Sequence, residues 1–375
     1  MKAIIICDSF KGTASSKEVN ALIKDEFEKR CPTLQTETIT FADGGEGFLE
    51  SIKENLSDVK ELSFPCFDSQ KKEKSIPCLI SNHKAYIEIA SLVGLKDVEG
   101  FSSPLTATTF GIGQLLQSLC SLGIRDFIIG LGGSATNDMG AGLLAALGYH
   151  FYIQEKEVFP YAYLLKDITK IEGDLNIPDG LTFTLFSDVT SPLLGKEGAT
   201  YTFARQKGAT EEELPLLEES LSHLHDLLEK KHHIQSKNKM GSGAAGGLGA
   251  VFYYLGETKV INGAQGILNL CHFEDKIKNC DFVITGEGKL DFTSLKGKAL
   301  SQVTSLCQKN HIPFTILCGR KEEGIENAFS AYPLLSIIPF HNQIHELSYL
   351  QEHLERDVRK GVEKFLNILK NTPLT

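Results

Sequence analysis

The chain has 375 residues, of which 42% are hydrophobic and 23% are charged. This length is more than a single hydrophobic core usually covers, so we expect two domains, and the composition is typical of a folded globular protein. The formal net charge of −10 argues against an extended basic surface for nucleic acid or an anionic membrane. Local pockets for phosphates or other small anions remain compatible with this charge.

The start of the chain indicates neither export nor membrane anchoring. Asp8 ends the first apolar run too early for a signal peptide, and no apolar stretch approaches the roughly 20 residues of a membrane helix. Nine cysteines are scattered without a C-x-x-C pair, which argues against a structural zinc site and fits reduced thiols. We therefore expect a cytoplasmic protein.

The chain begins and ends with alternating strands and helices. The apolar run 2–7 predicts a buried strand, and Ser15 with Glu18 predicts a capping box that opens a helix over about 16–30. The elements expected next are a strand at 36–41, a helix at 47–56, strands at 59–64 and 84–90, a helix at 107–122, a strand at 126–131 and a helix near 139–147. Those expected after them are a strand at 181–187, helices at 211–231 and from 243, a strand at 281–285, a helix at 296–309, strands at 313–318 and 335–339, and a helix at 354–370.

This order is typical of the α/β class, and we expect two α/β domains. Residues 1–63 and 281–375 would form one domain, with a Rossmann-like parallel sheet built from both chain ends. Residues 64–280 would form a second α/β domain inserted in the middle. The active site is expected in the cleft between the two.

Polar loops that contain glycine follow several of the expected strands, and ligands in open α/β sheets bind at the carboxyl ends of strands. The first loop contains Asp8, Ser9 and Lys11. The carboxylate of Asp8 could hold a metal, and the ammonium group of Lys11 could contact a phosphate or a carboxylate. In the second, Asp43 and Glu46 stand within a Gly-Gly turn, so their carboxylates could share a Mg²⁺ ion. Each loop by itself is also compatible with an ordinary turn.

Two more such loops lie in the middle of the chain. Residues 132–140 read Gly-Gly-Ser-Ala-Thr-Asn-Asp-Met-Gly, and their backbone N–H groups and hydroxyls can hold an anion. The candidate ligand-binding residues of this loop are Gly132, Gly133, Ser134, Thr136 and Asp138. Asp188, which leaves the strand at 181–187, could accept the proton of a substrate hydroxyl or ligate a metal. A helix cap and a plain turn are the alternatives for the two loops.

Three further segments carry candidate residues. Lys207 could contact a phosphate or a substrate carboxylate, although such lysines are often plain surface residues. Glu287 and Asp291 form an acidic pair after a buried strand and could hold a metal. Residues 241–246 match G-x-G-x-x-G, but no strand precedes them directly, so we reject a nicotinamide dehydrogenase and interpret the small residues as allowing close approach to a nucleotide or a helix. The nucleotide phosphate-loop and protein-kinase signatures are absent.

Taken in order, these loops resemble the bacterial glycerate kinase family along nearly the whole chain. The matching segments are Asp8–Gly12, Ala42–Gly47, Gly132–Asp138, Ser187–Val189, Gln206–Ala209, Gly243–Gly249 and Thr285–Gly288. Any one of them is a weak signal, whereas seven in sequence at similar spacing are specific. The chain departs from the family pattern at the edges of some motifs, for example at Ser191, Arg205 and Phe292.

The resemblance implies phosphoryl transfer from ATP to D-glycerate with Mg²⁺, giving 2-phosphoglycerate or 3-phosphoglycerate. A kinase for another hydroxy acid and a non-catalytic metabolite sensor remain as alternatives. Phosphoryl transfer needs mainly positioning and charge neutralisation. We assign metal contacts to Asp43, Glu46, Glu287 and Asp291, and charge neutralisation to Lys11 and Lys207. Asp188 is assigned as the base, with Asp8 or Asp138 as alternatives, and ATP or glycerate contacts are assigned to the 132–136 loop and to the loop with Gly243, Gly246 and Gly247.

Overall fold

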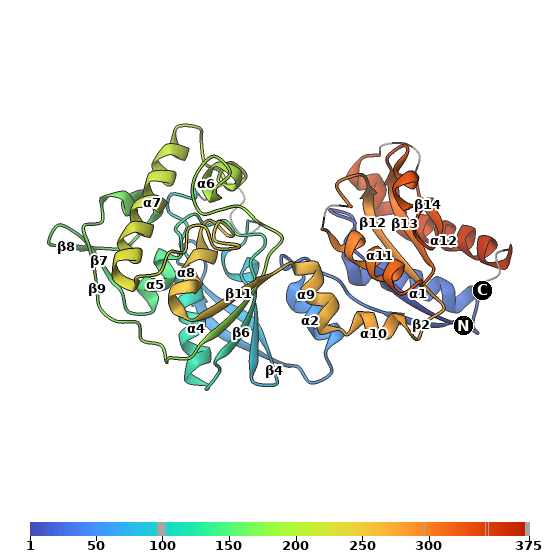
Figure 1. Ribbon diagram of the computed structural model, residues 1–375, viewed down its shortest axis with the longest axis horizontal. Coiled ribbons are helices and arrows are strands. Elements are labelled where there is room, and N and C mark those ends of the chain that lie inside the picture. The colour runs from blue at the N-terminus through green and yellow to red at the C-terminus, as the bar shows by residue number, and fades with distance from the viewer. Residues whose placement is uncertain (96–102, 296, 342, 344, 372–375) are drawn as a thin grey trace. The chain divides into compact units, whose positions relative to one another are not determined.

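A computed structural model describes residues 1–95, 103–295, 297–341, 343 and 345–371 (Figure 1). It has the expected α/β class, with two main sheets that contain parallel strands. The chain divides into two compact units. Unit 1 comprises Met1–Asp43, Glu50–Ser57 and Asn262–Thr375, and unit 2 comprises Gly44–Leu49 and Asp58–Ile261. The units thus begin and end at positions other than 63/64 and 280/281, and the cleft between the domains stays a prediction.

Unit 1 is built on a parallel sheet of five strands in the order β14-β13-β12-β1-β2. These strands are β1 (Lys2–Cys7), β2 (Gln35–Thr38), β12 (Phe282–Leu290), β13 (Phe314–Lys321) and β14 (Leu334–Pro339). The central pair joins the two ends of the chain, since β1 pairs with β12 in the register Ala3↔Phe282. The chain builds the sheet in one direction from β1 and in the other from β12, so their carboxyl ends form the topological switch point where α/β sheets bind ligands.

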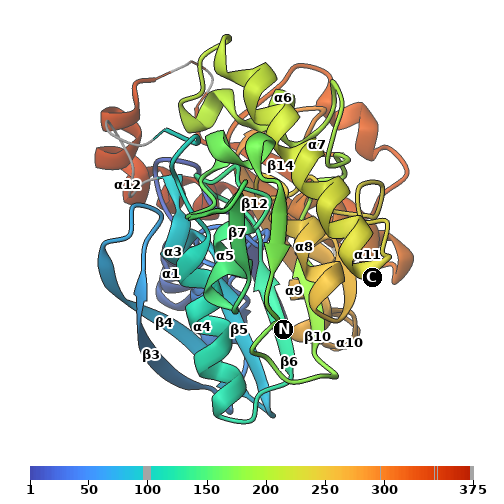
Figure 2. The same cartoon turned by 90° about the vertical axis from the view of Figure 1, so that its left-hand side faces the viewer.

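Helices cover both faces of this sheet. Crossovers between parallel strands are right-handed, so the two directions of growth place α1 (Ser16–Arg30) and α11 (Ala299–Lys309) on opposite faces. Figures 1 and 2 show α11 on the side away from α1 and α12 (Leu347–Asn371). The expected capping box is present, with the side chain of Ser15 accepting from the backbone N–H of Glu18 and the Glu18 carboxylate accepting from the N–H of Ser15. Phe27 of α1 and Phe365 of α12 pack edge to face in the core between them.

Unit 2 contains a mixed six-stranded sheet in the order β11-β10-β6-β5-β4-β3. The strands are β3 (Lys60–Phe67), β4 (Glu73–Ser81), β5 (Lys84–Glu88), β6 (Asp126–Gly130), β10 (Thr182–Phe186) and β11 (Glu257–Ile261). Strands β5, β6, β10 and β11 are parallel, so their carboxyl ends share one edge. The helices of unit 2 are α3 (Ala90–Val93), α4 (Phe110–Ser121), α5 (Ala141–Ala146), α6 (Ala199–Phe203), α7 (Glu213–His232) and α8 (Leu248–Leu255), whereas α2 (Phe48–Asn55) begins in unit 2 and continues in unit 1.

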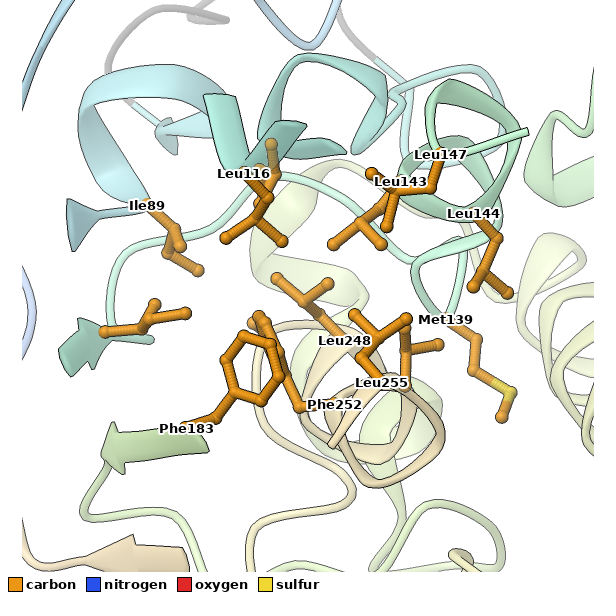
Figure 3. Packing of buried hydrophobic residues seen from close by; sticks show 14 of the residues in the cluster. Ile89, Leu116, Met139, Leu143, Leu144, Leu147, Phe183, Leu248, Phe252 and Leu255 are labelled. Carbon is orange, nitrogen blue, oxygen red and sulfur yellow. The ribbon is translucent and has the colours of Figure 1, made fainter. Parts of the chain in front are cut away.

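The main core of unit 2 lies between this sheet and its helices. Figure 3 shows Phe183 of β10, Leu248 and Phe252 of α8, and Leu143 of α5 pointing toward one another. All four are fully buried. This packing holds the sheet and the starts of α5 and α8 in a fixed relation, and the loops that carry the candidate residues extend from those elements.

Several local expectations were wrong. The helix expected from residue 243 begins at Leu248, because Ala245, Gly246 and Gly247 have positive φ angles of 54°, 66° and 87° that no helix accommodates. The sequence interpretation missed β4, β11, the small sheet of β7 (His150–Ile153), β8 (Lys156–Val158) and β9 (Lys170–Glu172), and the helices α9 (Gly263–Leu270) and α10 (Phe273–Ile277).

All nine cysteines are free. Among the described residues, no helix combines the length and the apolar composition that a membrane crossing requires.

Candidate active site

The switch point of unit 1 brings two predicted acids together. Asp8 follows β1, and its backbone N–H donates to the carbonyl of Gly286 in β12 at 2.8 Å. Glu287 is the next residue of β12 and is partly buried. The two carboxylates are close enough that the charge of Asp8 raises the pKa of Glu287. Neighbouring parallel strands therefore present two like charges at one edge of the sheet.

Electrostatics make this pair costly in the absence of a cation. Burial raises the pKa of Glu287 to about 7, the charges of Asp8 and Asp291 add to the effect, and Ser294 and Lys298 oppose it. Burial also raises the pKa of Asp8, and the charge of Asp43 adds to that effect. The Oε1 atom of Glu287 is buried and lacks a hydrogen-bond partner in the described part of the chain. A buried carboxylate oxygen without a partner is unfavourable, so this arrangement favours a bound cation.

The other predicted residues of unit 1 differ in their surroundings. Asp43 and Lys11 are exposed. The Asp8 carboxylate accepts the backbone N–H of Ser9 at 2.6 Å, and the Ser9 side chain also hydrogen-bonds to this carboxylate. Asp291 lies 2.5 Å from Lys289 Nζ, and the lysine together with Thr293 holds the pKa of this carboxyl well below its usual value. The charge of Asp291 is thus already neutralised by the protein.

The acids of unit 1 fit Mg²⁺ in kind, because this ion prefers oxygen ligands and usually keeps several waters beside one or two carboxylates and substrate phosphates. They do not form a closed cage. Among the described residues, the one group of three ligating side chains whose ligand atoms lie within 4.8 Å of one another is His225, Asp226 and Glu229 of α7, which no motif predicted. An ion held partly by water and phosphate is therefore the arrangement that Asp8, Asp43 and Glu287 can support.

In unit 2, the glycine-rich loops pack against one another backbone to backbone. The N–H of Gly132 donates to the carbonyl of Gly44 at 3.0 Å. A Cβ atom on Gly132 would lie 2.5 Å from Cα of Gly45, and one on Gly44 would lie 2.8 Å from the carbonyl oxygen of Phe186. Only glycine permits such approaches. These contacts bring the 44–47 segment, the loop after β6 and the end of β10 to one place.

The 241–247 turn joins the same group of loops. The N–H of Met139 donates to the carbonyl of Gly246 at 3.1 Å, and a Cβ atom on Gly246 would lie 2.0 Å from the carbonyl oxygen of Thr136. A Cβ atom on Gly243 would lie 2.3 Å from the carbonyl oxygen of Pro192, and Gly247 has a φ angle of 87°. The small residues thus allow close backbone packing here, in a turn with no strand directly before it.

Lys207 is the buried cation of this group. It is 5% exposed, and its Nζ atom donates to Ser134 Oγ at 3.0 Å and to the carbonyl of Thr136 at 2.7 Å. Burial lowers its pKa to about 7, and the charge of Asp138 opposes this effect. The hydroxyl of Thr136 is buried without a partner in the described part of the chain. A buried ammonium beside an unpaired hydroxyl makes this loop suitable for an anion.

Asp138 is fully buried, and its carboxylate is occupied by four donors. Thr109 contributes its N–H and its hydroxyl, both at 2.9 Å, and the N–H groups of Gly140 and Gly142 lie at 3.1 and 3.3 Å. Burial raises its pKa, and these hydrogen bonds act in the opposite direction. Asp138 therefore ties the starts of α4 and α5 together, and it has little capacity left to accept a proton from a substrate.

The remaining acids of unit 2 lie at the strand ends. Asp188 is exposed just beyond β10, and Glu46 is exposed on the 44–49 segment, so Asp43 and Glu46 belong to different units. Sequence reasoning missed Glu88 at the end of β5, whose carboxylate accepts the N–H of Leu49 at 3.1 Å near the start of α2. Burial raises its pKa, and the charge of Glu46 adds to that effect. An acid ending an otherwise apolar strand was the available signal.

The structure thus forms two groups of candidate residues. Unit 1 holds Asp8, Ser9, Lys11, Asp43, Glu287 and Asp291. Unit 2 holds Glu46, Gly132, Gly133, Ser134, Thr136, Asp138, Asp188, Lys207, Gly243, Gly246 and Gly247. The first group is rich in acids around an uncompensated carboxylate, and the second has a buried lysine among hydroxyls and glycines. One group suits a cation and the other suits an anion.

Comparison with known proteins adds an independent finding. Residues 3–370 match the model of the glycerate kinase family. The chain is 32% identical over 377 residues to the glycerate kinase of Haemophilus influenzae, which covers 98% of this chain and 99% of that protein. It is 32% identical over 344 residues to the glycerate 2-kinase of Escherichia coli K12, with 88% and 90% covered. A crystal structure from Salmonella typhimurium LT2, assigned as a glycerate kinase 2, superposes with a TM-score of 0.84 at 29% identity, covering 99% of this chain and 98% of that one.

Proposed function

The chain belongs to the glycerate kinase family, and we propose that it transfers the γ-phosphoryl group of ATP to a hydroxyl of D-glycerate with the help of Mg²⁺. The observation that carries this proposal is Glu287, a partly buried acid whose Oε1 atom has no hydrogen-bond partner among the described residues and whose pKa is raised to about 7, beside Asp8 at the switch point of a parallel sheet. Such a group is suited to releasing its proton when a metal-bound nucleotide arrives.

We assign the nucleotide phosphates and the metal to unit 1. Glu287, Asp8 and Asp43 would hold Mg²⁺, directly or through water, and the ion when bound neutralises phosphate charge. Asp291 is a weaker candidate for metal contact, because Lys289 already neutralises it. Lys11 is exposed on the Phe10–Ala14 turn directly after Asp8, and it can neutralise a phosphate oxygen.

We assign the glycerate carboxylate to unit 2. Lys207 Nζ donates to the Ser134 hydroxyl and to the carbonyl of Thr136, and the Thr136 hydroxyl is buried without a partner among the described residues. A carboxylate near this lysine would favour its protonated form and so restore the charge that burial disfavours. Gly132 and Gly133 allow the backbone to approach the substrate, and Asp138 holds the loop from behind.

Asp188 is the proposed base. It is exposed at the carboxyl end of β10, next to the packed glycine loops, whereas Asp138 is fully buried and occupied by four donors. A base must reach the substrate hydroxyl to take its proton, and accessibility therefore favours Asp188. Asp8 is better suited to the metal because it lies near Asp43 and Glu287, whose negative charges a cation would offset.

The acceptor hydroxyl is proposed to be the one on carbon 2, in line with the glycerate 2-kinase of Escherichia coli K12 that this chain resembles. The test is to incubate the protein with ATP, Mg²⁺ and D-glycerate and to identify the product by ³¹P and ¹H NMR. We expect 2-phosphoglycerate. Formation of 3-phosphoglycerate would overturn the choice of hydroxyl, and transfer only to another hydroxy acid would overturn the choice of substrate.

Binding of D-glycerate without turnover would point to a sensor and would refute the kinase proposal. Variants then test the roles. Alanine at Lys11 or at Asp188 should lower kcat by about 10²–10⁴-fold, the range expected for a charge-neutralising group or a general base. Circular dichroism and thermal unfolding check that each variant is folded. Near-normal turnover in a folded variant would remove that residue from the mechanism.

A further inference from the structure

Unit 1 contains a pocket one strand beyond the acidic pair, and no candidate residue lines it. The pocket has a volume of about 280 Å³ and lies at the carboxyl ends of β13 and β14, which Figure 1 shows next to each other. Its walls include Arg320 near the end of β13 and Glu323 beyond it, and Pro339 at the end of β14 and His341 beyond it. It therefore opens on the same edge of the sheet as Asp8 and Glu287.

The strand register connects this pocket to the acids. Glu287 of β12 is paired with Cys318 of β13, and Cys318 with Pro339 of β14. Side chains alternate along a strand, so Arg320 lies on the same face as Cys318. Burial raises the pKa of Cys318, and the charge of Glu287 raises it further. Two inter-strand spacings separate β12 from β14, on the order of 10 Å. An extended nucleotide whose phosphates lie at Glu287 can span that distance.

Arg320 is only partly exposed, yet its guanidinium makes no hydrogen bond or ion pair with any residue that the structure describes. Its neighbour Lys321 is different, since its Nζ atom lies 3.0 Å from Glu326 and its charge is compensated. The His341 ring lies at the pocket wall and packs against the ring of His345 with centroids 4.8 Å apart, while its Nε2 atom lies 3.1 Å from Oδ2 of Asp357 without forming a hydrogen bond. The pocket thus offers one uncompensated planar cation and one fixed aromatic ring.

These groups suit a nucleoside. A guanidinium and an imidazole can stack on the flat face of a purine, Pro339 adds an apolar wall, and Glu323 can accept hydrogen bonds from ribose hydroxyls. The volume is too small for a whole nucleotide but fits its nucleoside part, if the phosphates lie outside toward Glu287. We propose that this pocket binds the adenosine moiety of the phosphoryl donor, with Arg320 as its main contact. This inference rests on the proposed function, because it assumes that a nucleotide is the donor.

The experiment compares ligands with and without the nucleoside. Dissociation constants of ADP and of inorganic pyrophosphate, each with Mg²⁺, are measured by isothermal titration calorimetry for the full chain and for Arg320→Ala and Glu323→Gln. The matched control is Arg359→Ala, since Arg359 is an exposed arginine of α12 that pairs with Glu355 at 2.8 Å and does not line the pocket.

We expect Arg320→Ala to weaken ADP about tenfold or more, the usual loss for a charged contact, and to leave pyrophosphate unchanged within about twofold. Glu323→Gln should weaken ADP by a smaller factor with the same selectivity, and the control should change neither. Equal weakening of both ligands would make Arg320 a phosphate contact and would overturn the inference. So would unchanged ADP binding in both pocket variants.

Wild-type turnover separates this inference from the proposed function. If the wild-type protein phosphorylates D-glycerate with ATP while the pocket variants bind ADP normally, only the adenosine pocket is wrong. If the wild-type protein neither binds ADP nor turns over, the proposed function itself fails.

Discussion

Replacing Glu287 by glutamine should make the protein more stable and nearly inactive. The pKa of this carboxyl rises from 4.5 to about 7, a difference that corresponds to about 3 kcal/mol as an upper limit at pH 8. Because the side chain is partly exposed, solvent screening reduces the gain we expect to about 1–2 kcal/mol. For a folding unit of about 150–250 residues, that is a rise in Tm of about 2–8 °C.

The pH dependence gives this prediction its sign. The native carboxyl keeps its proton up to about pH 7, whereas the unfolded chain releases it near pH 4.5. The native state therefore binds more protons in that window, and the contribution of Glu287 to stability falls as pH rises through it. The advantage of Glu287→Gln should be largest at pH 8 and should shrink to less than about 1 kcal/mol at pH 5.

Thermal unfolding by circular dichroism at pH 5 and pH 8 measures the effect, with Glu28→Gln as a control at an exposed glutamate of α1. Adding Mg²⁺ and ATP should stabilise the wild-type protein more than the variant, because the variant lacks the carboxylate that we propose holds the ion. A variant that unfolds at or below the wild-type temperature at pH 8, or one that keeps full turnover, would refute the reasoning.

Three more predictions concern unit 2. Since the pKa of Lys207 is about 7, kcat/KM for glycerate should decline above pH 7, because the free enzyme loses the charge of this lysine. Lys207→Arg should shift the decline to higher pH, since arginine keeps its charge. A pH–rate profile that is the same for both proteins would contradict this prediction. Asp138→Asn replaces an acceptor of four hydrogen bonds and should cost about 2–4 kcal/mol in urea unfolding, whereas a loss below about 0.5 kcal/mol would show that the bonds contribute little. Gly246 has a φ angle of 66°, and a Cβ atom there would lie 2.0 Å from the Thr136 carbonyl oxygen, whereas Gly180 has a similar φ of 76° but its Cβ would meet nothing within 4 Å. Gly246→Ala should therefore lower Tm well beyond Gly180→Ala. Equal losses of Tm would mean that the backbone angle alone matters.

Features that depend on neighbouring residues could be read from the sequence. The run 2–7, the Ser15–Glu18 capping box and the helix after it were all predicted where the structure has them, because burial periodicity and end capping act within a few residues. The sequence positions of the glycine-rich loops followed in the same way. The strands β4, β11 and β7–β9 were missed, although β4 pairs with its sequence neighbours β3 and β5. The strand β11 pairs with the distant β10, and such long-range pairing is not visible in local sequence.

The tertiary structure decided what each acid and lysine in those loops can do. Asp138 and Asp188 both follow strands in sequence. Asp138 is buried and accepts four hydrogen bonds, whereas Asp188 is exposed. The sequence alone identified Glu287 and Lys207 as candidate residues, but their pKa values near 7 arise from burial and from charges brought close by the fold. Arg320 had no motif at all, and only the register, in which it pairs with Lys289 two residues beyond Glu287, places it on the strand next to the acids. Local sequence thus determined which residue types follow each strand, whereas burial and long-range charge, which depend on the packed chain, determined their chemistry.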